Sequence, residues 1–153
     1  MRTMDSWLQA YALSHQHPSN KRLHFWCVPA IFFVVFGMLR CLPQPAFFGH
    51  FSWAAMVLLL VCGYYFVLSK SFAVGFVLWA VLVWAGNEWL LATLGRGGLF
   101  GLSLLVFVLA WVGQFVGHRI EGKKPSFLQD IQFLLIGPAW LMAFVYQRLG
   151  IKW

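Results

Sequence analysis

The sequence carries few charged residues for its length. Of its 153 residues only 10% are Asp, Glu, Lys or Arg, whereas a soluble globular domain has roughly a quarter. Hydrophobic residues make up 61% of the chain, too many for a water-facing surface to cover. These fractions exclude an ordinary soluble domain, and we expect residues 1–153 to form a single integral membrane domain.

Acidic residues are especially scarce. Four Asp and Glu stand against eleven Lys and Arg, which gives a net charge of +7. The basic residues lie between and beside apolar runs and form no separate domain, so we expect no nucleic-acid partner. Anionic headgroups of membrane lipids are the expected partners of this charge.

Cysteine is also rare. The chain has three cysteines, Cys27, Cys41 and Cys62, all in or beside apolar segments and without CxxC spacing. This pattern excludes a disulfide framework and a zinc ribbon. We interpret the three thiols as small apolar residues of the interior.

Long apolar runs fill most of the chain, and each is close to the length of about 20 residues that a helix needs to cross a bilayer. We therefore predict an all-α, polytopic membrane bundle of four to five transmembrane or re-entrant helices with an N-terminal interfacial helix. The predicted elements are an interfacial segment (1–22), four spans within 23–117 (23–42, 52–69, 72–93 and 99–117), a polar metal-site loop (118–126) and a last helix (127–149).

The boundaries of these elements follow from local signals. Ser19 or Asn20 is predicted to cap the first span, and the glycine-rich segment 95–98 is predicted to form the turn before the fourth span. Interruptions in the last apolar stretch leave three possibilities open, since it could cross the membrane, re-enter it or lie along the interface.

The distribution of basic residues predicts the orientation. With the amino terminus in the cytoplasm, seven basic residues lie inside and two outside. The inside set is Arg2, Lys21, Arg22, Lys70, Arg119, Lys123 and Lys124, and the outside set is Arg40 and Arg96. We expect a multi-pass protein, in the inner membrane if bacterial and in the endoplasmic reticulum if eukaryotic, with its histidine-rich segments on the cytoplasmic face.

Three histidines could meet at that face. His15 and His24 flank a turn that starts at Pro18, so they can converge although nine residues separate them, and His118 closes the fourth span. Clustered imidazoles are usual ligands for iron or zinc, with carboxylates or amides orienting them. Asn20 and Glu121 lie on the same helix faces as His24 and His118, respectively.

A second interpretation of these histidines stays open, because imidazoles also occur at the headgroup level of membranes without binding a metal. We interpret His17, which precedes Pro18, and His50 in the opposite loop as non-ligands. Asn87 and Glu88 fall near the outer face, far from the histidines, where an interfacial cap or a bond to a neighbouring helix is their expected role.

Two segments resemble a known family, the small membrane 2-hydroxy fatty acid dioxygenases. The family is named for the metabolism of phytosphingosine to odd-numbered fatty acids, and the resemblance covers nearly the whole chain. The segments are YALSHQHPSNKRLHFWCVP at 11–29 and WVGQFVGHRIEGKKP at 111–125.

The resemblance implies an iron(II)-dependent enzyme of lipid metabolism. Its expected substrates are a 2-hydroxy fatty acid and dioxygen, and its products are carbon dioxide and a fatty acid one carbon shorter. The implied metal ligands and catalytic residues are His15, His24 and His118, with Glu121 as a further catalytic residue and Asn20 at the Fe(2+) site in support.

Two other enzyme or carrier classes fit the sequence less well. A di-iron hydroxylase or desaturase needs more histidines than the five present. A haem carrier with two histidine ligands would hold them facing each other within the membrane. A non-catalytic lipid-binding or scaffold membrane protein remains the alternative function.

Overall fold

The computed structural model describes residues 3–46, 51–125 and 132–153. Over these ranges the chain forms five helices and no strand. The helices are α1 (Met4–Ala12), α2 (Pro18–Cys41), α3 (Trp53–Leu68), α4 (Lys70–Glu121) and α5 (Phe133–Leu149). The prediction of an all-helical chain is confirmed.

Polar side chains at the helix starts explain most of the boundaries. Ser52 caps α3, and Ser69 both ends α3 and caps α4. The start of α2 differs from the prediction, because the helix begins at Pro18 and its cap is the His17 side chain. Proline favours the first helical position, where its fixed φ suits the helix and its missing N–H costs no hydrogen bond.

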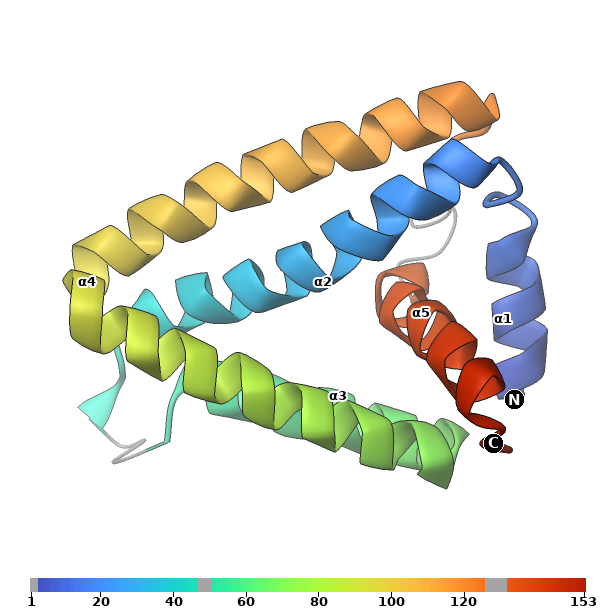
Figure 1. The fold of residues 1–153 in the computed structure, drawn as a ribbon. Coiled ribbons are helices and arrows are strands. Elements are labelled where there is room, and N and C mark those ends of the chain that lie inside the picture. The colour runs from blue at the N-terminus through green and yellow to red at the C-terminus, as the bar shows by residue number, and fades with distance from the viewer. Residues whose placement is uncertain (1–2, 47–50, 126–131) are drawn as a thin grey trace.

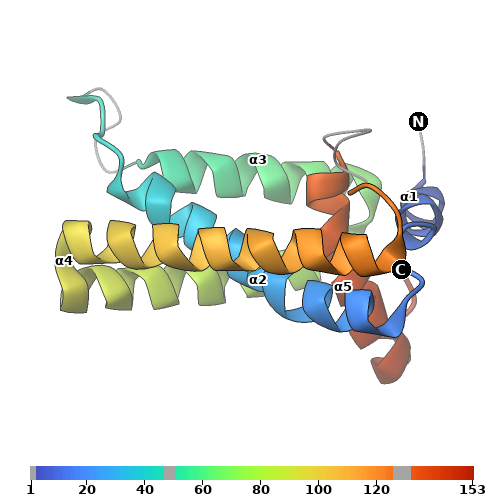
Figure 2. The same cartoon turned by 90° about the horizontal axis from the view of Figure 1, so that it is seen from above.

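A single glycine divides α4 into two halves. Gly95 has φ 67° and ψ 175°, a conformation that essentially only glycine adopts. The predicted turn over 95–98 is therefore too long, since the helix resumes directly after Gly95. The two halves fold back as a V (Figure 1), and the view from above shows them one over the other (Figure 2).

The V determines where the other helices lie. α2 runs beside the second half of α4 in both views, α3 lies by the first half, and α5 and α1 stand across the open end (Figures 1 and 2). The predicted N-terminal helix is present as α1. One face of it packs against α5, where Trp7 and Phe133 make an edge contact with centroids 5.3 Å apart.

Two helices of the described residues, α2 and α4, are long and apolar enough to cross a membrane by length and composition. α3 and α5, at 16 and 17 residues, are shorter than the roughly 20 residues of a full crossing. Large apolar side chains face outward along all of these helices, among them Leu60, Leu78, Leu82, Leu105 and Leu109. Such a surface suits lipid better than water.

The kink gives a testable prediction. Gly95→Ala places a side chain in a glycine-only conformation and should lower the free energy of unfolding by about 1–3 kcal/mol. Gly97→Ala is the matched control, because nothing lies within 4 Å of its added methyl group and alanine favours a helix. Denaturant unfolding in detergent compares the two, and equal stability of both variants would contradict the account.

Candidate metal centre

Three histidines from separate parts of the chain meet at the open end of the V. His15 follows α1, His24 lies in the second turn of α2, and His118 lies in the last turn of α4. Their candidate ligand atoms all lie within 4.8 Å of one another. The side chains are 1%, 1% and 4% exposed, so the predicted convergence is realised in a site closed to bulk water.

Hydrogen bonds fix two of the three rings. His15 Nδ1 lies 2.7 Å from the Tyr11 carbonyl oxygen, and His24 Nδ1 lies 3.1 Å from the Asn20 carbonyl oxygen. Because a carbonyl oxygen only accepts, each Nδ1 donates a proton in these bonds, and the Nε2 of His15 keeps its lone pair. Histidine ligands are commonly oriented in this way by a backbone carbonyl.

Two ring nitrogens in the cluster have no hydrogen-bond partner although they are buried. They are His15 Nε2 and His118 Nδ1. A buried polar atom without a partner costs free energy, and a metal ion among the three rings would satisfy both nitrogens at once. The donor set therefore fits a divalent metal that prefers imidazole, such as iron or zinc.

Burial also keeps the imidazole of His15 in the neutral form that can bind a metal. Burial is the main reason that the pKa of His15 falls to about 4; the neighbouring His118 and Lys21 act in the same direction, and the bond to the Tyr11 carbonyl and the Glu121 charge oppose the shift. The imidazole is then neutral near pH 7, as metal binding requires. Tyr11 stacks on the ring with centroids 4.0 Å apart.

Glu121 holds the turn that carries His15. Its Oε1 accepts from the backbone N–H of Gln16 at 2.7 Å, and its Oε2 accepts from that of His17 at 2.8 Å and from Asn20 Nδ2 at 3.1 Å. Both carboxylate oxygens are thus occupied by donors of the turn and of α2. Glu121 is a positioning residue here, rather than a group in contact with the rings.

Asn20 is the second link between the same elements. It is fully buried, and its Nδ2 also donates to the Ser14 carbonyl oxygen at 3.2 Å. A side chain at Gly117 would place its Cβ 2.4 Å from Asn20 Oδ1. Glycine at 117 therefore lets α4 approach α2 closely enough to bring His118 beside His24.

The remaining predicted residues fall elsewhere. The loop expected at 118–126 starts later, because α4 continues through Glu121 and ends at Gly122 in the left-handed conformation. His17 is exposed and its Nδ1 accepts from the Ser19 N–H at 3.2 Å. His50 lies outside the described residues.

Asn87 and Glu88 lie in the first half of α4, towards the kink and away from the histidines. The Glu88 carboxylate pairs with Arg40 of α2 at 2.6 Å. Asn87 Nδ2 donates to the Phe33 carbonyl oxygen of α2 at 3.2 Å. The prediction that these side chains bond a neighbouring helix is confirmed.

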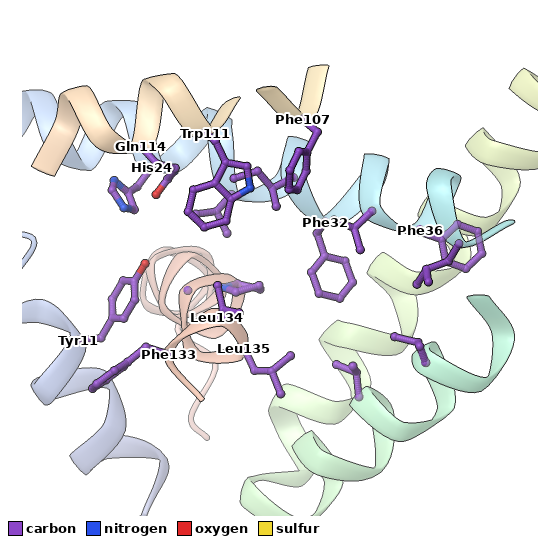
Figure 3. Close-up of a pocket in the computed structure, with 18 of the residues that line it drawn as sticks. Tyr11, His24, Phe32, Phe36, Phe107, Trp111, Gln114, Phe133, Leu134 and Leu135 are labelled. Carbon is purple, nitrogen blue, oxygen red and sulfur yellow. The ribbon is translucent and has the colours of Figure 1, made fainter. Parts of the chain in front are cut away.

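An apolar cavity of about 370 Å³ begins at the histidines and extends between α2, α3, α5 and the second half of α4. Figure 3 shows Tyr11, His24 and Gln114 at one end and Phe36 at the other. The lining is almost wholly hydrocarbon apart from the three imidazoles, Tyr11 and Gln114. A polar head beside the rings and an apolar tail in the cavity would both be accommodated.

Sequence reasoning missed two residues at this end of the cavity. Gln114 is 6% exposed and its Nε2 is buried without a hydrogen-bond partner. Trp140 of α5 lies beside His15, with ring centroids 5.4 Å apart. Gln114 lies one helical turn before His118, and that spacing was the available signal; nothing in the sequence placed Trp140.

The fold and the site define a helical protein with a buried three-histidine cluster at the end of an apolar cavity. Residues 1–149 match the sequence model of one family, which is described as 2-hydroxy-palmitic acid dioxygenase Mpo1-like. The chain belongs to this family, as its two motifs suggested. No curated protein and no solved structure matches it.

The role of Glu121 is testable by metal binding. Glu121→Gln removes one acceptor from the turn that carries His15 and should weaken iron(II) binding about 10- to 100-fold. Glu88→Gln is the matched control, because that carboxylate pairs with Arg40 near the kink. Anaerobic titration with iron(II) measures both, and wild-type affinity in Glu121→Gln would contradict the positioning role.

Proposed function

We propose that the chain is an iron(II)-dependent dioxygenase that shortens 2-hydroxy fatty acids by one carbon. The overall reaction is R–CH(OH)–COOH + O₂ → R–COOH + CO₂ + H₂O. The bond between the carboxyl carbon and the hydroxylated carbon breaks, dioxygen is reduced, and the hydroxylated carbon is oxidised to the new carboxyl group. The observation that carries the proposal is the buried histidine cluster at the end of an apolar cavity.

The metal proposed is iron because the reaction passes electrons from the substrate to dioxygen, which calls for a redox-active metal. Zinc prefers the same imidazole donors but has no redox chemistry. Iron(II), when bound, would supply a redox-active centre with open positions for dioxygen and for the head of the substrate. His15, His24 and His118 are the residues that would hold it.

The other residues of the site bind and orient the substrate. The Gln114 amide is the donor that would bond a carboxylate oxygen of the head, since its Nε2 is buried without a partner. Burying an unpaired donor is costly, and a substrate oxygen would relieve that cost. The apolar lining holds the tail and excludes water from the rings.

The membrane arrangement is part of the proposal. α2, α3 and the two halves of α4 cross the bilayer as a polytopic bundle, with the histidines near the cytoplasmic face as the basic residues predict. α3 is included because α2 and the first half of α4 must both begin on the cytoplasmic side if the three histidines are to meet there. The large apolar side chains exposed on these helices would then contact lipid. A 2-hydroxy fatty acid is itself an amphiphile, so a site at the headgroup level with a cavity towards the hydrocarbon suits it.

The reaction is tested with a 2-hydroxy acid labelled in its carboxyl carbon. Purified protein loaded with iron(II) should release labelled carbon dioxide in equal amount to the dioxygen consumed. His15→Ala, His24→Ala and His118→Ala should each reduce the rate by at least about 100-fold, because each removes a metal ligand. His17→Asn, which removes an exposed imidazole outside the cluster but keeps a side chain able to cap α2, should retain most of the rate.

The alternative function, a non-catalytic lipid carrier or scaffold, makes the opposite prediction for the same experiment. It expects no labelled carbon dioxide from the wild type. It also expects the three cluster variants to bind lipid as well as His17→Asn does.

The role of Gln114 has its own test. Gln114→Leu keeps the size of the side chain but removes the donor, and it should weaken binding of a 2-hydroxy acid about tenfold or more. Affinity for the corresponding primary alcohol should change little, because that ligand lacks the carboxylate. Equal loss for both ligands would show that Gln114 acts only through packing.

A further inference from the structure

The cavity follows one face of α2 for most of the length of that helix. Its lining residues there include His24, Val28, Phe32, Phe36 and Leu39, at the three- and four-residue intervals of a single helix face. His24 marks the metal end. Leu39, fifteen residues further along, marks the other end, near the close of α2.

The positions of the lining residues on α2 determine the length of the cavity. Fifteen residues of helix rise about 22 Å at about 1.5 Å each. A fully extended covalent chain advances up to about 3.6 Å per three bonds, or about 1.2 Å per bond. The distance from His24 to Leu39 therefore matches a straight hydrocarbon chain of about 18 bonds.

The volume indicates one chain rather than two. At about 370 Å³ the cavity is near the lower limit of ligand pockets, which range over roughly 300–1,000 Å³. A single acyl chain suits this volume, and a lipid with two acyl chains would not fit in the cavity.

Buried side chains close the far end. α3 begins beside the end of α2 (Figure 1), so Leu58, in the second turn of α3, lines the cavity towards this end, and it is 8% exposed. Phe36, which is 3% exposed, is backed by Trp84 of α4 with ring centroids 5.5 Å apart. In Figure 3, Phe36 lies at the end of the pocket away from His24. A longer tail would have to displace packed side chains, which cores resist.

We propose that the cavity measures the acyl chain of the substrate, with the head fixed at the histidines and Leu58 limiting the length of the tail. This inference rests on the proposed function, because it takes the carboxyl end of the ligand to lie at His15, His24 and His118. The cavity then accepts a saturated 2-hydroxy acid of up to about 19 carbons, since about 18 bonds join that number of carbons. Longer acids lose binding because their last methylenes find no space.

The test varies the far end of the cavity without touching the metal site. Leu58→Trp shortens the cavity, Leu58→Ala lengthens it, and Leu60→Trp is the matched control, since Leu60 is on the same helix and 67% exposed. Binding of a series of saturated 2-hydroxy acids is measured by displacement of a fluorescent fatty acid. Turnover of the same series is measured in parallel.

The expected result is a shift of the preferred length. In Leu58→Trp the longest acids bound by the wild type should lose about fourfold in affinity for each methylene that is displaced. Leu58→Ala should extend the preference to longer acids, and Leu60→Trp should keep the wild-type profile. Unchanged length profiles in both Leu58 variants would overturn the proposal.

Failure of the two proposals can be told apart. Turnover by the wild type with the same length profile in all variants would reject the length limit and keep the dioxygenase. Binding with the expected shifts but without turnover would reject the dioxygenase and keep the length limit. Leu58→Ala preserves the test if Leu58→Trp fails to fold.

Discussion

The contact between Glu121 and the turn after α1 is the constraint on which the site depends. One carboxylate at the end of α4 accepts two backbone N–H groups and the Asn20 amide, and so joins three elements that are far apart in the sequence. Bonds between a carboxylate and N–H donors are among the stronger ones in proteins. Together with the bond from Asn20 to the Ser14 carbonyl oxygen, this contact holds the turn so that His15 lies against His24 and His118.

The kink at Gly95 determines where α2 and α3 lie relative to the two halves of α4. By folding α4 back on itself, it opens a V in which α2 and α3 can lie with an apolar cavity between them (Figure 1). The ion pair of Arg40 and Glu88 and the bond from Asn87 fasten α2 to α4 towards the kink. The helices are thus tied at both ends, with polar contacts at the metal site and near the kink and hydrocarbon between them.

The sequence predicted the helices and the three histidines because these depend on local patterns. Apolar runs determine spans, and the Pro18 turn allows two imidazoles to converge. It could not predict that α1 packs on α5, because this contact joins the two ends of the chain. It could not predict the partners of the Glu121 oxygens either, because these are backbone N–H groups, which every residue other than proline carries. Gln114 and Leu58 were missed for a related reason, since only tertiary packing decides which side of a helix faces a cavity. The family match supports the activity at the level of its description.

The central claim is that the three histidines hold one iron ion, and equilibrium dialysis against iron(II) under anaerobic conditions tests it most directly. The account predicts one iron per wild-type chain, with binding lost when any one of His15, His24 and His118 is replaced by alanine. Wild-type protein that is folded and yet binds no iron, or variants that bind it as the wild type does, would contradict the account.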